Sequence, residues 1–325
     1  MEDLRFTKLT PLGTLCASPQ RDPDGHLTFA PVTLPDLLAV LDLEPLEDRL
    51  FRGRSHATPW GRVFGGQVLA QALLASALTV PDDRRVHSLH GYFILGGDVG
   101  KPIVYDVERL REGRSFTTRR CTAVQKGEAI FNSATSYHVP EAGPEHQRDA
   151  PDVPGPEGLP TSVQLAERYR ETAPALYQRL ARRLPIEVRP VDDYDLLRPD
   201  DYPPQYRVWI RVDGEMPADP RLHQAVLAYA SDYHLLTTAV VPHLRTLPFH
   251  RLMMASLDHA MWFHAADVRV DEWLLFAIDS PWAGGARGFT RGSIYDRGGR
   301  LVASVAQEGL MRARRESGVL AHVGR

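Results

Sequence analysis

The sequence has little cysteine and little net charge, and each shortage excludes a class of protein. Two cysteines in 325 residues, Cys16 and Cys121, are too few for a disulfide framework or a cysteine-rich zinc site, and they fit a reducing compartment. The formal net charge is −3, from 38 basic and 41 acidic residues, so no global field would attract nucleic acid or anionic lipid. We therefore expect no nucleic-acid partner.

The sequence also lacks a clean membrane span and a secretory signal. Its most apolar run, residues 63–80, is interrupted by two glutamines and a serine and falls short of a transmembrane helix. The first residues have neither the cationic region nor the apolar stretch of a signal peptide. These features predict a soluble, cytoplasmic protein.

Proline is concentrated in one stretch, and this divides the chain. Six of the 26 prolines lie between residues 140 and 160, a density that excludes a helix or a central strand. Thr33 and Pro35 suit the first turn of a short helix near the N-terminus. The predicted segments are an N-terminal arm with a short helix (1–44), a first regular region (45–140), a proline-rich linker with a short helix interrupted at Pro174 (141–205) and a second regular region (206–325).

The two regular regions resemble each other, which predicts a duplicated unit. Each opens with a β-rich run, continues into one long apolar helix and ends in several β segments. Residues 64–78 correspond to residues 222–236, and both stretches are apolar nearly all round, so each helix should be buried on most sides. The β segments are expected at 86–95, 103–110, 115–124 and 129–138 in the first region, and at 252–264, 272–278, 288–295 and 301–311 in the second.

Short loops between consecutive β segments exclude a parallel sheet, because each parallel connection needs a long crossover. Gly127 and the pair Gly298-Gly299 lie where tight hairpins are expected. The pattern therefore predicts an α+β protein with two repeats, each a curved antiparallel sheet wrapped around a central apolar helix.

Common cofactor and metal motifs are missing. There is no Gly-x-Ser-x-Gly elbow, and the segment Gly96–Lys101 lacks the spacing of a phosphate-binding loop. Two histidine pairs, His87 with His90 and His259 with His264, have spacings that would place their members on opposite faces of a regular strand. We expect no metal and no separate cofactor.

Differences between the repeats mark the candidate site. Asp232 is expected inside the second helix among apolar neighbours, whereas the first repeat has Leu74 at the matching position. A buried carboxylate needs donors nearby or acquires a raised pKa, and both outcomes suit a group that handles a proton. A carboxylate that caps a loop or pairs with an arginine is the alternative interpretation.

Two further polar residues break the symmetry of the repeats. Gln307 is expected to face the core from the last strand, where the first repeat has about Ser136. Ser256 is expected on the strand 252–264, on the same side as Asp258, which makes Asp258 an alternative carboxylate. With Asp232 they would supply an acceptor, an amide and a hydroxyl, the groups needed to hold and orient one water molecule.

Several motifs occur in a characteristic order. The first region contains Phe51-Arg52-Gly53, Val63-Phe64-Gly65-Gly66-Gln67, Val86-His87-Ser88-Leu89-His90 and Gly113-Arg114-Ser115-Phe116. The second contains Leu227–Asp232, Leu257–His264, Ala286-Arg287-Gly288-Phe289 and Val305–Gly309. This series resembles the acyl-CoA thioesterase II family of double-hotdog hydrolases, over roughly residues 45–140 and 205–315.

The resemblance implies a catalytic set and a reaction. By motif the catalytic residues fall on Asp232, Ser256 and Gln307, the three that the repeat comparison selects; the family often has threonine where Ser256 stands. The implied reaction converts acyl-CoA and water into a fatty acid and free coenzyme A, with coenzyme A as part of the substrate. The resemblance also implies a homo-oligomer of double-hotdog subunits.

Further substrate-binding candidates and alternatives follow from the same motifs. Gly65 and Gly66 open a helix whose N–H groups could bind the thioester oxygen, and Asp258 and Arg287 are two more candidate contacts. One alternative is a hotdog hydratase or dehydratase acting on an enoyl thioester, suggested by the adjacent pair Asp258-His259. A non-catalytic acyl-thioester binding protein is the other.

Overall fold

The computed structural model describes residues 20–21, 27–28, 31–58 and 61–313. Much of the expected N-terminal arm, including Cys16, lies outside these residues. The described part of the arm holds a two-residue ladder, β1 (Gln20–Arg21) with β2 (Leu27–Thr28), and helix α1 (Leu34–Leu41). Thr33 caps α1 in a capping box with Asp36, and Pro35 lies in its first turn, as predicted.

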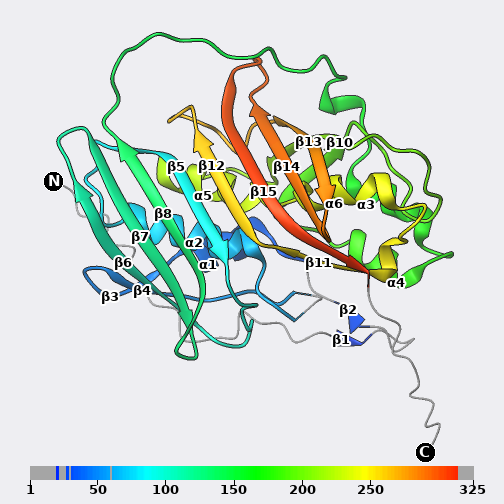
Figure 1. The fold of residues 1–325 in the computed structure, drawn as a ribbon, viewed down its shortest axis with the longest axis horizontal. Coiled ribbons are helices and arrows are strands. Elements are labelled where there is room, and N and C mark those ends of the chain that lie inside the picture. The colour runs from blue at the N-terminus through cyan, green and yellow to red at the C-terminus, as the bar shows by residue number, and fades with distance from the viewer. Residues whose placement is uncertain (1–19, 22–26, 29–30, 59–60, 314–325) are drawn as a thin grey trace, which may run out of the picture.

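A single antiparallel sheet of thirteen strands forms the framework of the protein (Figure 1). Its order is β3-β4-β6-β7-β8-β5-β12-β15-β14-β13-β10-β9, and β11 pairs with β15. The first repeat contributes β3 (Glu44–Glu47), β4 (Leu50–Gly53), β5 (Arg85–Phe93), β6 (Ile103–Glu112), β7 (Phe116–Gln125) and β8 (Glu128–His138). The second contributes β9 (Ile186–Pro190), β10 (Gln205–Val212), β11 (Leu252–Ser256), β12 (Asp258–Phe263), β13 (Leu274–Gly284), β14 (Arg287–Tyr295) and β15 (Leu301–Ala313).

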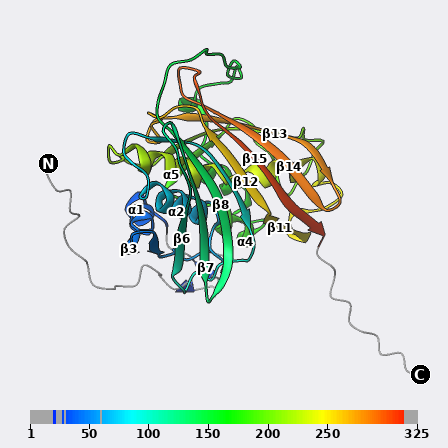
Figure 2. The same ribbon diagram turned by 60° about the vertical axis from the view of Figure 1, so that its left-hand side comes forward.

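The two repeats meet where β5 pairs with β12, with Leu89 opposite Met261. Within each repeat consecutive strands form hairpins. The β7–β8 turn contains Lys126 and Gly127, both with positive φ, and the β14–β15 turn contains Gly299 at φ 81°, so the predicted hairpin positions are confirmed. Figure 2 shows the resulting curved wall of strands.

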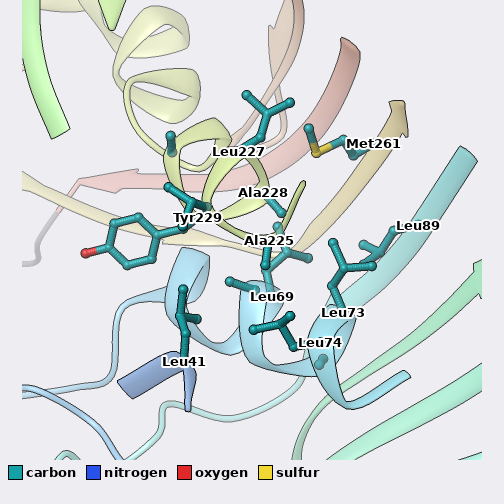
Figure 3. Close-up of a cluster of buried hydrophobic side chains, with 14 of the residues drawn as sticks. Leu41, Leu69, Leu73, Leu74, Leu89, Ala225, Leu227, Ala228, Tyr229 and Met261 are labelled. Atoms are coloured by element: carbon teal, nitrogen blue, oxygen red, sulfur yellow. The ribbon is translucent and has the colours of Figure 1, made fainter. Parts of the chain in front are cut away.

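Two central helices, α2 (Gly65–Ala77) and α5 (Pro220–Ser231), pack against each other on the concave side of the sheet (Figures 1 and 2). Every residue of α2 from Gly66 to Ala77 is buried, and α5 is buried from His223 onward. Figure 3 shows leucines of α2 meeting α5 beside Leu89 and Met261 of the two seam strands. The predicted α+β architecture of two helix-and-sheet repeats is confirmed.

The second helix is shorter than predicted. We expected one helix over 222–236, but α5 ends at Ser231, Asp232 is its C-cap residue, and a new helix α6 (Leu235–Val240) starts after His234. His234 adopts the left-handed conformation, with φ 68°. The sequence has neither glycine nor proline there, so the strongest signals of a helix end are missing, and only the lower helix propensity of Ser231, Asp232 and His234 accompanies the break.

The proline-rich stretch contains more regular structure than predicted. Helices α3 (Ser162–Ala166) and α4 (Pro174–Leu180) occur in it, and Pro174 begins a helix instead of interrupting one. Its end forms β9, an edge strand paired with β10. The Trp209 indole donates to the Pro154 carbonyl at 2.8 Å, so the stretch packs on the outer face of the sheet in the second repeat.

Short 3₁₀ turns complete the second half of the chain. They are η1 (Pro156–Gly158), η2 (Glu167–Tyr169), η3 (Val241–His243) and η4 (Phe249–Arg251). In the described part of the chain, no helix is long and apolar enough to cross a membrane.

Candidate active site

Asp232 lies between the ends of the two central helices. It caps the C-terminus of α5, and its side chain is 5% exposed. The N-terminus of α2 faces it: the Gly66 N–H bonds to the carboxylate, and a Cβ added at Gly65 would lie 2.7 Å from Asp232 Oδ2. Glycine at position 65 therefore allows the helix to approach the carboxylate, while the dipole of α2 favours its negative charge.

The structure brings the three predicted catalytic residues together. Gln307 Nε2 on β15 donates to Asp232 Oδ1 at 2.9 Å, and the Ser256 hydroxyl, at the end of β11, hydrogen-bonds to the same carboxylate. Gln307 Oε1 is buried and has no partner among the described residues, so it can accept a bond from a bound molecule. Acceptor, amide and hydroxyl thus converge on one point.

Burial dominates the electrostatics of this carboxylate. Desolvation raises the pKa of Asp232 to about 6, although the bonds from Gln307, Gly66 and Ser256 act in the opposite direction. Asp232 is therefore mostly ionised at neutral pH and remains basic enough to accept a proton. A pKa close to the working pH suits a general base.

A β-bulge at Leu257 places Ser256 on the inner face. Ser256 lies opposite Gly309 on β15, whereas Ala260 lies opposite Ala306, so one extra residue is inserted between β11 and β12. The alternation of faces is inverted at that point. The prediction that Ser256 and Asp258 share a face is therefore wrong, because it assumed one regular strand over 252–264.

Two of the substrate-binding candidates lie away from Asp232. Asp258 Oδ1 accepts the Glu308 N–H at 2.7 Å on the outer face of the sheet. The Arg287 side chain is half exposed and pairs with Glu308, Nε to Oε1 at 3.2 Å. Because Glu308 follows the inward-facing Gln307, this group lies on the side of the sheet opposite the helices, and the structure does not support its contact with a substrate beside Asp232.

The bulge turns His259 inward, toward Asp232. The sequence had not placed His259 in the catalytic set. Its ring is fully buried, and Nδ1 lies 3.9 Å from Asp232 Oδ1. Burial lowers the pKa of His259 to about 3, so the ring is neutral. Nothing in the sequence marks a bulge at Leu257, and without it His259 would face the opposite side.

A second bulge, at His87, changes another expectation. His87 bonds to Ser136, and His90 contacts Trp262 edge to face, so both histidines lie on the outer face of the sheet instead of on opposite faces. Among the described residues, no three His, Cys, Asp or Glu side chains gather as metal ligands would.

The two bulges, at His87 and Leu257, lie at corresponding points of the two repeats and therefore give an alignment of their strands. Tyr92-Phe93 at the end of β5 then matches Trp262-Phe263 at the end of β12, and Leu89 occupies the place of His259. Thr135 lies opposite Leu89, so it, and not the outward-facing Ser136, is the counterpart of Gln307.

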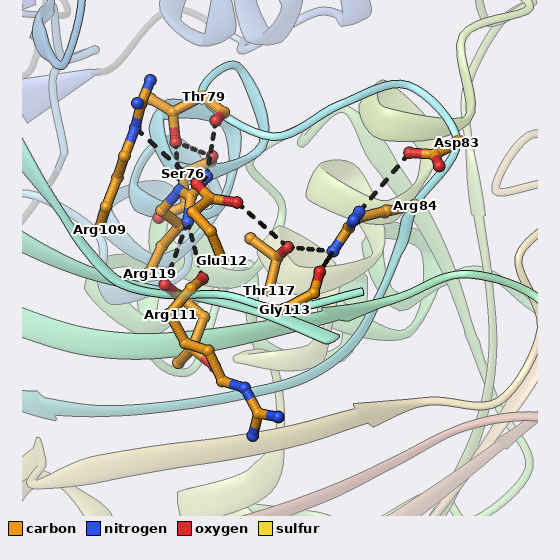
Figure 4. Close-up of polar contacts among 11 residues, drawn as sticks. Ser76, Thr79, Asp83, Arg84, Arg109, Arg111, Glu112, Gly113, Thr117 and Arg119 are labelled. Carbon is orange, nitrogen blue, oxygen red and sulfur yellow. Dashed lines mark hydrogen bonds and ion pairs between the residues drawn. The ribbon is translucent and has the colours of Figure 1, made fainter. Parts of the chain in front are cut away.

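In the first repeat, a cationic side chain lies at the C-terminus of the central helix, where the second repeat has the Asp232 carboxylate. The Arg119 guanidinium is fully buried and donates to the Thr79 carbonyl at 2.8 Å, just beyond the end of α2 (Figure 4). It also bonds to Glu112, while Arg84 bonds to Gly113 and Thr117. A cation at a helix C-terminus is stabilising, and the position that matches Asp232 is the apolar Leu74.

Comparison with known proteins identifies the family. The family descriptions "Acyl-CoA thioesterase N-terminal domain" and "Acyl-CoA thioesterase" match residues 54–138 and 183–310. Human acyl-coenzyme A thioesterase 8 is 41% identical over 302 residues, which are 90% of this chain and 92% of that protein. Acyl-CoA thioesterase 2 of Haemophilus influenzae is 39% identical, covering 86% and 98%.

A solved structure shows the same fold. The acyl-CoA thioesterase II TesB2 from Mycobacterium marinum superposes with a TM-score of 0.71 at 41% identity, covering 87% of this chain and 99% of that one. The fold is therefore that of a double-hotdog thioesterase. The chain belongs to the acyl-CoA thioesterase II family, as the motifs predicted, and it is an acyl-CoA thioesterase.

Proposed function

We propose that this enzyme hydrolyses fatty acyl-CoA by direct attack of water, with Asp232 as the general base. Asp232 removes a proton from water, the water oxygen bonds to the thioester carbon, and the carbon–sulfur bond then breaks. Asp232 passes the proton to the departing coenzyme A sulfur, so no acyl-enzyme forms. The observation that carries the proposal is the buried carboxylate, held by Gln307, with a pKa raised to about 6.

Gln307 and Ser256 share one task in this proposal, and Gln307 has a second. Each bonds to the carboxylate, which fixes its orientation. The Gln307 Oε1 atom, which has no partner among the described residues, accepts one hydrogen of the attacking water. A positioned general base typically contributes about 10²–10⁴-fold to the rate.

The thioester oxygen becomes anionic during the attack and needs an N–H donor. Because the Gly66 N–H already bonds to Asp232, we assign this role to the amide of Gly65, the first residue of α2. The first amides of a helix have no partner within the helix, and its dipole stabilises negative charge there.

A hydratase mechanism fits the geometry less well. The adjacent pair Asp258-His259 cannot act together, because Asp258 bonds to Glu308 on the outer face and His259 is buried on the inner face. Loss of a catalytic group would have favoured a non-catalytic binding protein, but all three groups converge. The cytoplasmic location and the homo-oligomeric assembly expected from the sequence stay predictions.

Two assays on the same preparation distinguish these functions. We expect release of free thiol from saturated acyl-CoAs of several chain lengths. With a 2-enoyl-CoA, we expect the enoyl absorbance to decrease no more than hydrolysis of its thioester bond accounts for. Hydration of the enoyl-CoA without thiol release would contradict the proposal. Binding of acyl-CoA without turnover of any chain length would favour the non-catalytic alternative.

The raised pKa predicts a specific pH dependence. Because only the ionised carboxylate can accept a proton, kcat/KM should fall as the pH decreases through about 6, approaching tenfold per pH unit below it. We expect this from initial rates between about pH 4.5 and about pH 8, measured with a thiol reagent that reacts in acid. A rate that stays level down to about pH 5 would contradict the raised pKa of Asp232.

A further inference from the structure

A buried hydrogen-bonded chain connects α5 to His259. The Ser231 hydroxyl lies 2.9 Å from the Ala228 carbonyl oxygen and 3.0 Å from His259 Nε2. Ser231 and His259 are both fully buried. On the other side of the ring, Nδ1 has no hydrogen-bond partner among the described residues and lies 3.9 Å from Asp232 Oδ1.

This chain determines which ring nitrogen carries the proton. The Ala228 carbonyl oxygen can only accept a hydrogen bond, and the Asp232 N–H donates to the Ala230 carbonyl instead of to it. The single hydroxyl hydrogen of Ser231 is therefore donated to the Ala228 carbonyl. The Ser231 oxygen then accepts a hydrogen bond from His259 Nε2–H. The neutral ring has one N–H, and Nδ1 therefore presents a lone pair to the catalytic carboxyl group.

We propose that His259 is a positioning residue, held by Ser231 in the tautomer whose unprotonated Nδ1 faces Asp232. The inference rests on the proposed role of Asp232 as the base. A lone pair beside the carboxylate disfavours its ionised form, and the same atom accepts a hydrogen bond from the carboxyl group once it has taken the proton from water. Both effects make Asp232 a stronger base, while the proton remains on Asp232 until it goes to the sulfur.

The repeat asymmetry supports this role independently. On the alignment set by the two bulges and the paired helices, Ser231 and His259 correspond to Leu73 and Leu89, as Asp232 corresponds to Leu74. Both leucines are buried in the hydrophobic core. The first repeat folds with leucines at all three positions. The serine–histidine pair occurs only in the second repeat, which also has the aspartate.

The other groups that face Asp232 do not titrate in the same range. From β15, β11 and α2 it meets Gln307, Ser256 and the Gly66 amide, which are uncharged. Tyr229 on α5 and Tyr233 after it interact with it electrostatically, and burial raises the pKa of Tyr229 to about 12 and that of Tyr233 well above 10. A change in the acidic limb of the rate profile therefore reports on Asp232 and its neighbour His259.

Replacement of Ser231 by alanine tests the inference. Without the hydroxyl, His259 can protonate Nδ1 and donate to the carboxylate, which stabilises the ionised form. We expect Ser231→Ala to lower the midpoint of the acidic limb of kcat/KM by about one pH unit and to reduce kcat several-fold with little change in KM. His259→Phe, which keeps a ring but removes both nitrogens, should shift the midpoint in the same direction.

Matched variants keep the outcomes separate. Ser76→Ala removes a fully buried serine from the last turns of α2 and should leave the acidic limb where it is in the wild type. An unmoved limb in folded Ser231→Ala and His259→Phe, with Asp232→Asn inactive, would overturn the role of His259 and leave the proposed function intact. Activity in Asp232→Asn would instead refute the base assignment on which the inference rests.

Discussion

Asp232→Asn is expected to lower kcat on an acyl-CoA by at least about a hundredfold, in line with the loss of a general base. Asparagine has the same shape and can still accept a hydrogen bond from Gln307 Nε2 at the carboxylate position, so substrate binding and KM should change little. What disappears is the group that accepts the water proton. The measurement is steady-state thiol release above about pH 7, where wild-type Asp232 is ionised.

Asp258→Asn is the matched control for this substitution. Asp258 is a carboxylate on the neighbouring strand, but it bonds to Glu308 on the outer face of the sheet. It should therefore retain wild-type kcat within a few-fold. Turnover by Asp232→Asn near the wild-type rate, or an equal loss in Asp258→Asn, would refute the assignment of Asp232.

Asp232→Asn should not reduce the stability of the protein at alkaline pH. A folded-state pKa raised from 3.8 to about 6 means that the folded protein binds the proton more tightly than the unfolded chain, and this contribution is lost as the pH rises through 6. Above pH 6 the ionised side chain costs up to roughly 3 kcal/mol, at 1.36 kcal/mol for each pKa unit. We therefore expect Asp232→Asn to melt no lower than the wild type at about pH 8, by thermal unfolding.

Leu74→Ala, at the matching position of the first repeat, is expected to reduce stability and to leave kcat nearly unchanged. Leu74 is 6% exposed and belongs to the hydrophobic core around α2. Its truncation should reduce the free energy of unfolding by about 2–5 kcal/mol, from lost apolar burial and the remaining cavity. The kcat of the folded enzyme should stay near wild type, because the catalytic groups lie at the other end of the helix pair.

Equilibrium unfolding in urea and thiol release on the same samples measure this contrast. Leu78→Ala is the control: Leu78 directly follows α2, is 51% exposed and should change stability by less than about 0.5 kcal/mol. A large loss of kcat in folded Leu74→Ala would mean that the first repeat takes part in the chemistry.

The comparison of the repeats predicted more of the site than any short motif did. Asp232 was selected because a carboxylate replaces Leu74 of the first repeat, and Gln307 because a long amide faces the core where the first repeat has a small hydroxyl residue. The structure joins the two side chains at 2.9 Å. The helices, most strands and the hairpin turns were also predictable, since each follows from a local pattern of apolar residues and glycine. Those patterns are contained within one element at a time.

The errors arose where long-range pairing overrides a local pattern. The bulge at Leu257 depends on how β11 and β12 share β15, and it exchanged the faces of Asp258 and His259. The end of α5 at Ser231 and the edge strand β9 likewise depend on neighbours distant in the sequence. Neither the bulge at Leu257 nor the end of α5 is marked by the glycine or proline that would signal a break in a local pattern.

The sequence by itself therefore determined the duplicated α+β architecture and the repeat that carries the acid, because burial periodicity and its exceptions are written along the chain. Only the tertiary structure decided that Asp232 lies between two helix ends, that Ser256 turns inward and that Ser231 and His259 stand behind the carboxylate. These depend on strand register and helix termination, which are set by the free energy of packing all the elements together.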